Sequence, residues 1–178
     1  IAANQLLKMS ESIRHRGPDD EGFFIHGKGN SFFLRGNDSK SYQYEHAANA
    51  NFQEINIGFV HRRLSILDLS EAGHQPMKLP DFSGVMIYNG EVYNYKEIRE
   101  ELRSFGYSFF SDSDSEVILR SYAHWGSDCV KKFKGMWAFA IFLPEQNKLF
   151  FSRDRFGIKP LYYYKTNDTL IFGSEIKA

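Results

Sequence analysis

The stretch Tyr88-Asn89-Gly90-Glu91-Val92-Tyr93-Asn94 decides how this chain is interpreted, because an apolar segment precedes it and a helix start follows it. Residues 84–88 (GVMIY) are apolar and rich in strand formers. Asn94 is placed to cap a helix, with Glu97 three residues further on and apolar residues at helical spacing after it. The pair Asn89-Gly90 is therefore expected where a buried strand ends, in a turn or a kink.

Two interpretations of Asn89-Gly90 compete. Asn-Gly between apolar runs is the commonest hairpin turn, and on this stretch alone the turn is favoured. The alternative is chemical, because a backbone N–H and a side-chain amide N–H aimed at one spot can stabilise the oxyanion of an acyl-transfer intermediate. The rest of the chain has to decide between a turn and an oxyanion hole.

Composition limits the classes of protein that fit. The chain has 178 residues without an internal repeat, which favours one domain with a sizeable core. Aromatic residues make up 16% of the chain, which indicates a globular, β-rich protein. The 22 Lys and Arg residues balance the 22 Asp and Glu residues, so neither nucleic acid nor a membrane surface is expected as a partner. The longest apolar run, residues 136–143, is too short to span a bilayer.

Cysteine usage and the N-terminal residues bear on location and completeness. Cys129 is the single cysteine, so an internal disulfide is impossible, and no signal peptide is visible. Both features predict a cytoplasmic protein. The chain opens on Ile1 without an initiator methionine, so we expect that residues upstream have been removed or left out.

The first half of the chain is predicted to hold one helix and three strands between polar loops. Leu6, Leu7, Met9 and Ile13 fit one face of a short amphipathic helix. The following elements are a polar loop at 14–22, strands at 22–26 and 31–35 joined by a turn at 27–30, a surface loop at 37–53, a strand at 55–60 and a loop at 71–84.

Arg62 and Arg63 follow the strand at 55–60. In extended backbone, adjacent side chains point to opposite faces. One of the two arginines is therefore expected to face solvent, and the other to point inward, where it needs an anion.

The second half is predicted to hold two helices followed by two hairpins. One helix covers 95–105 and ends at Gly106, and a capping box from Ser113 to Glu116 opens another that ends at Gly126. The hairpins pair 137–143 with 148–152 and 161–165 with 169–173. These strands are apolar on both faces, so we expect both faces to be covered. The predicted fold is α+β, a four-layer αββα sandwich of two antiparallel sheets.

Six blocks then coincide in one order along the chain. They are RHRGPD at 14–19, RLSILD at 63–68, NGEVYN at 89–94, SDSEVI at 113–118, GMWAFA at 135–140 and RDRFGIKPLYY at 153–163. Together they resemble the class II glutamine amidotransferase domain of glutamine-dependent asparagine synthetase. The likeness runs from about Leu6 to Ala178, and the first and last blocks resemble this branch more than the purine or hexosamine branches.

This resemblance implies the N-terminal nucleophile hydrolase fold, which is the αββα sandwich expected above. In the family, an N-terminal cysteine attacks the side-chain amide of glutamine, and its own α-amino group, with a pKa near 7.7–8.0, serves as the base. A second, ATP-using domain then uses the ammonia to convert aspartate to asparagine. The resemblance therefore implies glutamine and a C-terminal synthetase domain as partners, with a homodimer left open. It implies no cofactor in residues 1–178, and ATP and Mg²⁺ in the synthetase domain, which this chain lacks.

The resemblance also assigns a set of site residues. The Asn89 side chain and the Gly90 N–H match the oxyanion hole, and Arg63 matches the clamp on the glutamine α-carboxylate, since a guanidinium binds a carboxylate bidentately. Asp114 and Glu91 match the acceptors of the substrate α-ammonium, and the backbone near Leu67 would complete the pocket. From the residues alone, Arg63 could equally be a structural ion-pair partner, Asp114 a helix-terminus charge and Glu91 a solvated strand residue.

The chain departs from the family pattern at the nucleophile. Position 1 is not a cysteine, and the usual cysteine-glycine-isoleucine opening is absent. Cys129 lies in a stretch expected to be helical and buried, so it is not a substitute. As it stands, the chain is expected to be a fragment that does not hydrolyse glutamine.

Two other functions stay open, a glutaminase domain that serves a different acceptor, such as a sugar or β-lactam precursor, and a non-catalytic glutamine-binding or regulatory module. The spacing of His15, His61 and His74 matches no metal-ligand pattern, so no metal site is predicted and these histidines are expected to be structural or gating.

Overall fold

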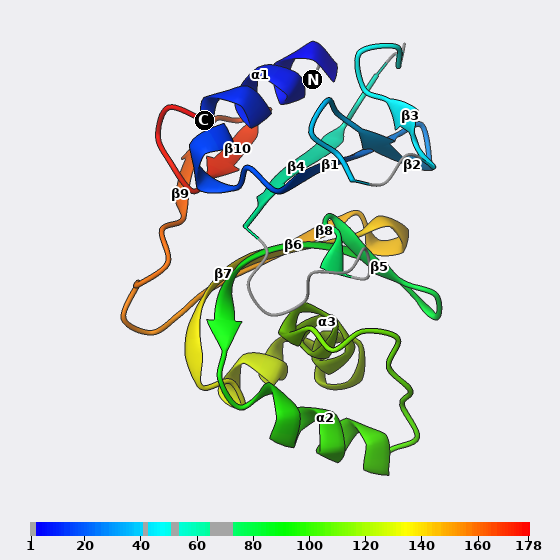
Figure 1. Ribbon diagram of the computed structural model, residues 1–178, viewed down its shortest axis with the longest axis vertical. Helices are drawn as coiled ribbons and strands as arrows, with labels where there is room; N and C mark the ends of the chain where they lie inside the picture. Colours follow the sequence, from blue (N-terminus) through cyan, green and yellow to red (C-terminus); the bar gives the residue numbers. More distant parts are fainter. Residues whose placement is uncertain (1–2, 41–42, 51–53, 65–72) are drawn as a thin grey trace.

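A computed structural model describes residues 3–40, 43–50, 54–64 and 73–178 of the chain (Figure 1). The helices are α1 (Ala3–Ser12), α2 (Tyr95–Ser104) and α3 (Asp114–Trp125), with 3-10 turns η1 (Arg14–Arg16), η3 (Gly126–Lys131) and η4 (Pro144–Gln146). The strands are β1 (Asp20–Gly27), β2 (Asn30–Arg35), β3 (Glu45–His46), β4 (Ile57–Arg63), β5 (Met77–Leu79), β6 (Phe82–Val92), β7 (Gly135–Leu143), β8 (Lys148–Arg153), β9 (Tyr162–Lys165) and β10 (Leu170–Gly173).

Two four-stranded sheets pack face to face between helices. Their strand orders are β3-β2-β1-β4 and β5-β6-β7-β8. Between them lies an apolar cluster in which Phe24 and Phe59 of the first sheet meet Val85, Ala140 and Phe142 of the second. Helix α1 covers the outer face of the first sheet, α3 covers the outer face of the second, and α2 packs against α3 (Figure 1). The predicted α+β class with two packed sheets and helices outside them is confirmed.

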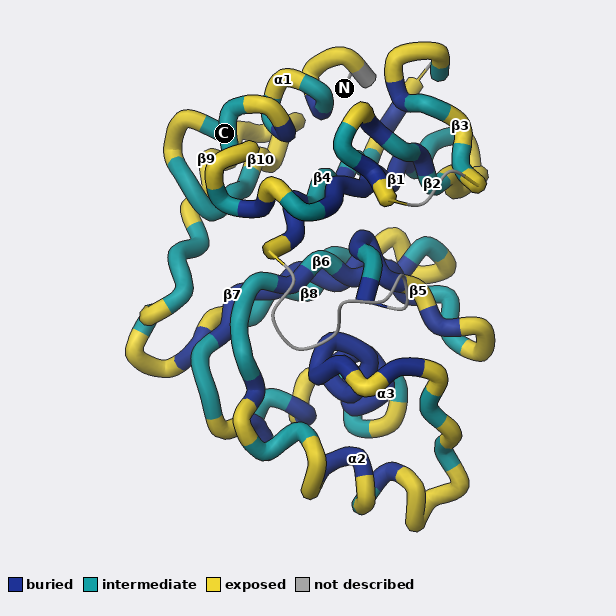
Figure 2. Tube along the Cα trace, in the orientation of Figure 1, coloured by how far each residue is buried: buried dark blue, intermediate teal, exposed yellow. Residues whose placement is uncertain are grey.

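Two details of the sheets differ from the prediction. Strands β2 and β3 pair in parallel, although the rest of the first sheet is antiparallel. Strands β9 and β10 form a separate two-stranded ribbon. All four residues of β9 are exposed, so the expectation that this hairpin is covered on both faces is wrong (Figure 2). In β7, by contrast, every residue from Trp137 to Leu143 is buried, as predicted.

The prediction of a hairpin turn at Asn89-Gly90 is also wrong, because β6 continues through both residues. Strand β6 pairs with β7 in unbroken register from Val85 opposite Phe142 to Val92 opposite Gly135. Gly90 is needed for this close pairing, since a Cβ there would overlap the carbonyl oxygen of Met136 and lie 2.8 Å from the Cα of Trp137. The partner strand, which lies some 45 residues away, overrides the local turn signal.

Strand β4 extends to Arg63, and neither arginine of the pair faces solvent. Both residues are 8% exposed. Arg62 points toward α1, where it binds the Ser10 hydroxyl at 2.8 Å, Glu21 at 3.0 Å and Asp38 at 2.6 Å. The prediction that one arginine is solvated is wrong because α1 and its neighbouring loop cover the second face of β4.

Helix ends follow the prediction in part. Ser113 caps α3 by accepting a hydrogen bond from the Glu116 N–H at 3.3 Å, although the Glu116 carboxylate reaches back to the Ser111 N–H rather than to the cap residue. Asn94 does not cap α2. Its side chain instead bridges the carbonyl of Lys132 and the N–H of Lys134, so tertiary contacts take the group that the local pattern assigned to capping.

Several other boundaries match the sequence. The hairpin of β1 and β2 turns at Lys28 and Gly29, which have positive φ angles, and α2 and α3 end near Gly106 and Gly126, which also have positive φ angles. The predicted loop at 71–84 is incomplete, because it contains β5, whose Met77 and Leu79 are buried. The predicted loop at 37–53 contains the short strand β3.

Candidate functional site

The second half of β6 has an open edge. Strand β5 pairs with β6 only as far as Met77 opposite Met86. Within the part of the chain that the structure describes, residues 87–92 of β6 therefore have a strand neighbour on the β7 side alone. Backbone groups on the other side need partners from elsewhere. This open edge contains Asn89 and Gly90.

Side chains from three other segments complete most of the edge. The Tyr88 N–H donates to Gln75 Oε1 at 2.7 Å, and the Tyr88 carbonyl lies 2.9 Å from His61 Nε2. The Val92 N–H donates to Asp114 Oδ2 at 3.0 Å. These three contacts replace the ladder that a further strand would have made.

The N–H of Gly90 points to the same edge. Backbone groups alternate sides along a strand with a period of two, so residues 88, 90 and 92 share one direction. Gly90 therefore directs its N–H between two capped neighbours, toward a cavity of about 260 Å³ that it helps to line. We call this hollow the edge cavity. The residues that line it are Arg16, His61, Arg62, Arg63, Leu64, Gly73, Gln75, Tyr88, Asn89, Gly90, Ser113, Asp114, Ser115 and Lys159.

The edge cavity brings together four of the six residues predicted for the site. Arg63, Asn89, Gly90 and Asp114 all line it, although they come from β4, β6 and the first turn of α3. Glu91 is half-buried and does not line it, and Leu67 lies outside the described residues. Charged and polar side chains dominate the lining, so the cavity suits a small zwitterion rather than an apolar ligand.

Arg63 reaches the cavity from the last position of β4. Its guanidinium lies against the backbone of Gly73, where any Cβ would overlap Nη2. Its backbone carbonyl accepts a hydrogen bond from the Asp19 N–H at 3.1 Å, which fixes the end of the strand. Gly73 and Asp19 therefore hold the arginine in place from two directions.

Asp114 is buried beneath the open edge, with 5% of its surface exposed. Its Oδ2 accepts hydrogen bonds from the Tyr88 hydroxyl at 2.6 Å and from the Val92 N–H. Burial raises the pKa of Asp114, these two donors and the Ser115 N–H oppose the rise, and the charge of Glu91 adds to it. The carboxylate thus ties α3 to β6 while it lines the cavity.

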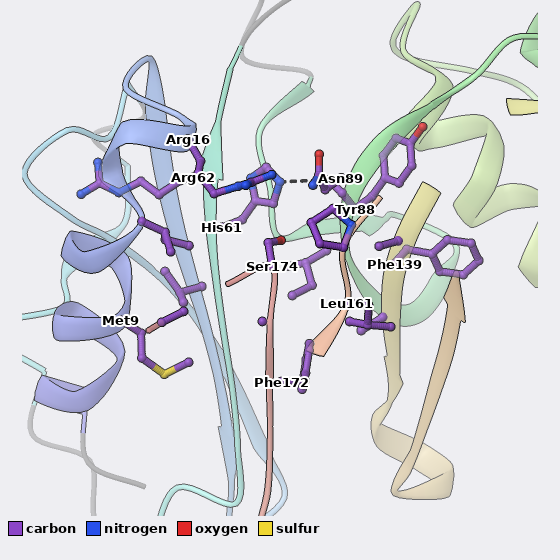
Figure 3. Close-up of a pocket in the computed structure, with 18 residues that line it drawn as sticks. Met9, Arg16, His61, Arg62, Tyr88, Asn89, Phe139, Leu161, Phe172 and Ser174 are labelled. Atoms are coloured by element: carbon purple, nitrogen blue, oxygen red, sulfur yellow. Dashed lines mark hydrogen bonds between the residues drawn. The ribbon is translucent and has the colours of Figure 1, made fainter. Parts of the chain in front are cut away.

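A second cavity of about 120 Å³ lies between the two sheets, and Asn89 lines it as well (Figure 3). We call it the inter-sheet cavity. It shares Arg16, His61, Arg62, Tyr88 and Asn89 with the edge cavity. The rest of its wall is mainly apolar and includes Met9, Phe139, Leu161 and Phe172 (Figure 3). Asn89 therefore stands at the boundary of a polar and an apolar space.

Gln75 and His61 complete the open edge together with Asp114, and sequence reasoning gave neither Gln75 nor His61 this role. A signal existed for His61, because it lies two residues before Arg63 and must share its face of β4. No comparable signal marked Gln75. His15 and His74 form pairs with Glu175 at 2.8 Å and Asp20 at 2.7 Å, respectively.

Cys129 lies on η3 in the apolar cluster between the helices and the second sheet, and it lines neither cavity. Burial raises the pKa of its thiol to about 12, so the reactive thiolate is negligible at neutral pH. In the described ranges, no group of three or more His, Cys, Asp or Glu side chains is placed to hold a metal ion. The helices of these ranges include none long and apolar enough to cross a membrane.

Comparison with known proteins identifies the family. The family described as "Glutamine amidotransferase domain" matches residues 29–178, and this chain belongs to it. A protein of Methanocaldococcus jannaschii that is described as glutamine-hydrolysing asparagine synthetase 2 is 40% identical to this chain over 192 aligned residues. The alignment covers 100% of the chain and 32% of that protein. Asparagine synthetase 1 of Bacillus subtilis is 40% identical over 175 residues, which cover 98% of the chain and 23% of that protein. The chain thus spans about a third or less of these relatives.

A solved structure shows the same fold. Glutamine phosphoribosylpyrophosphate amidotransferase from Bacillus subtilis superposes with a TM-score of 0.72, over 92% of this chain and 37% of that one, at 18% identity. The resemblance to class II glutamine amidotransferases, inferred above from six short blocks, is confirmed by the family match and by the relatives.

Proposed function

We propose that this chain is the glutaminase domain of a glutamine-dependent asparagine synthetase, with the N-terminal nucleophile hydrolase fold. It would hydrolyse glutamine to glutamate and ammonia, and an ATP- and Mg²⁺-dependent synthetase domain of the parent protein would use the ammonia to convert aspartate to asparagine. The observation that carries the proposal is the convergence of Arg63, Asp114, Asn89 and the Gly90 N–H on one cavity of about 260 Å³.

The four groups match the parts of free glutamine. The Arg63 guanidinium would bind the α-carboxylate through two parallel hydrogen bonds, and the Asp114 carboxylate would accept from the α-ammonium, with the charge of Glu91 nearby. The side-chain carbonyl would then lie at Asn89 and Gly90. In the reaction, negative charge develops on that oxygen, so the Asn89 amide and the Gly90 N–H stabilise the transition state more than the bound substrate.

The nucleophile of the proposed reaction is a cysteine thiol encoded upstream of Ile1. Its proton passes to the α-amino group of the same residue, the sulfur bonds to the side-chain carbonyl carbon, and ammonia leaves with that proton. Water then hydrolyses the thioester to glutamate.

The test is a glutaminase assay on the full encoded protein, read from its own start codon. We expect a cysteine directly after the initiator methionine and glutamate release that does not require aspartate or ATP. A different residue at that position, with glutamine bound but not hydrolysed, would make the chain a binding module.

Two variants of the active protein separate binding from chemistry. Asn89→Ala should lower kcat by about 10²- to 10³-fold, as for one lost oxyanion donor. Arg63→Ala should chiefly raise KM for glutamine. Exposed residues of the same type give matched controls, Asn30→Ala and Arg103→Ala, which should leave both constants unchanged. Normal turnover in Asn89→Ala would remove the oxyanion assignment.

A further inference from the structure

His61 joins the two strands that carry the proposed site. It lies on β4, two residues before Arg63 and on the same face, and its Nε2 is 2.9 Å from the carbonyl of Tyr88 on β6. Tyr88 directly precedes Asn89. One hydrogen bond therefore connects the strand with the carboxylate clamp to the strand with the oxyanion donors. Figure 3 shows His61 and Tyr88 among the residues that line the inter-sheet cavity, and both residues also line the edge cavity.

The partner atom fixes the tautomer of His61. A carbonyl oxygen only accepts hydrogen bonds, so the bond to Tyr88 requires a proton on Nε2. The other ring nitrogen, Nδ1, is buried and has no hydrogen-bond partner in the described part of the chain. In this neutral ring Nδ1 carries a lone pair. Protonation would add a second N–H at Nδ1, and that N–H would have no acceptor among the described residues.

The surroundings of His61 keep the ring neutral. Burial, helped by the nearby charges of His74 and Arg63, lowers the pKa of His61 to about 4, although the Tyr88 carbonyl and Asp20 act in the opposite direction. Arg16, Lys159 and Asp114 line the same edge cavity. At neutral pH the side chain is therefore an uncharged donor with one fixed orientation.

A purely structural role fits this position poorly. A buried polar atom without a partner costs about 1–3 kcal/mol. Phe59, two residues earlier on the same face of β4, is 1% exposed and fills its place between the sheets with an apolar ring. A residue that lowers stability while it holds the backbone next to the oxyanion donors fits a role in site geometry.

We propose that His61 is a positioning residue for glutamine hydrolysis, which holds the Tyr88-Asn89-Gly90 segment at a fixed distance from Arg63 through its Nε2–H bond to the Tyr88 carbonyl. This inference rests on the proposed function. Without the bond, the side-chain contacts to the open edge of β6 that remain among the described residues are those of Gln75 and Asp114, and the donors at 89 and 90 can shift. Misplacement by about 1 Å can lower a rate about 100-fold, so the loss should fall on kcat.

The first experiment tests the geometry without catalysis. Long-range ¹H–¹⁵N spectra of the ¹⁵N-histidine-labelled chain report tautomer and protonation, and the His61 signal is assigned by its loss in His61→Gln. We expect the neutral Nε2–H tautomer with no titration between pH 8 and pH 5. A proton on Nδ1, or titration near pH 6.5, overturns the proposal.

The second experiment tests the positioning role in the full protein. His61→Leu should lower kcat by about ten- to hundredfold with KM for glutamine within about twofold. His61→Gln, whose amide N–H can reach the Tyr88 carbonyl, should recover most of that loss. Rates are normalised to sites labelled by an electrophilic glutamine analogue, so that misfolded protein does not count.

The outcomes separate the two proposals. Unchanged kcat in His61→Leu, or equal losses in the leucine and glutamine variants, overturns the role of His61 while glutaminase activity of the parent protein stands. Absence of glutaminase activity in the parent protein overturns the proposed function, and with it the catalytic role of His61.

Discussion

The two sheets are held to their covering helices by different forces. Helix α3 packs on the second sheet through a continuous apolar cluster that includes Ile118, Leu119 and Phe139. Helix α1 lies on the first sheet with a smaller apolar cluster around Leu6, and beside it Arg62 forms buried ion pairs. Figure 2 shows α3 buried along most of its length, whereas exposed, intermediate and buried residues alternate along α1.

This difference matters because the site takes groups from both sides. Asn89 and Gly90 belong to the half with the larger apolar cluster, although α3 also carries the buried ion pair of Glu116 and Arg120. Arg63 and His61 belong to β4, whose outer face depends on charge pairing. The proposed oxyanion donors are therefore expected to be robust, and the proposed carboxylate clamp to be the part that charge mutations and acid disturb.

The largest expected effect breaks the apolar half. Phe133, 1% exposed, packs edge-on against Trp137 at a ring distance of 5.7 Å. Phe133→Ala should lower the free energy of unfolding by about 4 kcal/mol through lost burial and a cavity. Urea denaturation measures this, with Phe156→Ala as the control, because Phe156 is 89% exposed and should matter little. Equal effects in both variants would contradict the assignment of this core.

The next effect breaks the charged half. Arg62→Leu leaves Glu21, whose side chain is 4% exposed, without its buried cation. We expect a loss of about 3 kcal/mol in the free energy of unfolding. The matched control is Arg103→Leu, which removes an exposed pair with Glu100 and should change stability by about 0.5 kcal/mol or less. If the two variants behave alike, β4 is not held by charge.

Acid should destabilise the charged half further, because His61 on β4 is buried in its neutral form. Its pKa in the folded state is about 4, below the unfolded value of 6.5, so the unfolded chain binds the proton first. Ionisation of His61 therefore has no effect on the free energy of unfolding above the unfolded pKa. As pH falls from 7 to 5, it lowers the free energy of unfolding by about 2 kcal/mol. Urea denaturation across this range should show a flatter pH dependence for His61→Gln. Identical slopes for the two proteins would contradict the neutral, buried ring.

The smallest effect concerns the helix that carries Asp114. Ser113 caps α3 through its bond from the Glu116 N–H, so Ser113→Ala should lower the free energy of unfolding by about 1 kcal/mol. Ser127→Ala, at an exposed turn position, serves as the control. A neutral Ser113→Ala would mean that the apolar face alone places the start of α3.

Features that depend on neighbouring residues were predictable from the sequence. The strands at 137–143 and 148–152 were recognisable because an apolar run carries its own pattern, and Ser113 because a cap acts within its own turn. Asn89-Gly90 was misread as a turn when taken alone, since pairing with β7 decides its conformation. The same is true of Asn94, whose side chain is engaged by Lys132 and Lys134.

The site was predictable only in part, for the same reason. Arg63, Asn89, Gly90 and Asp114 stood out because their blocks resemble a known family, and the structure gathers them in one cavity. The open edge, and the roles of Gln75 and His61 in completing it, follow from where β5 stops pairing. That end point is a property of the assembled sheet, which no local pattern in the sequence reveals.

The open edge of β6 also determines which molecules can pair with this sheet. A peptide that adds itself to a sheet needs donors and acceptors repeated every second residue along the edge. Here the N–H groups at 88 and 92 and the carbonyl at 88 are already engaged by Gln75, Asp114 and His61. A polypeptide segment would find too few vacant backbone groups to dock as a strand, whereas a free glutamine bound as proposed needs a single N–H, that of Gly90.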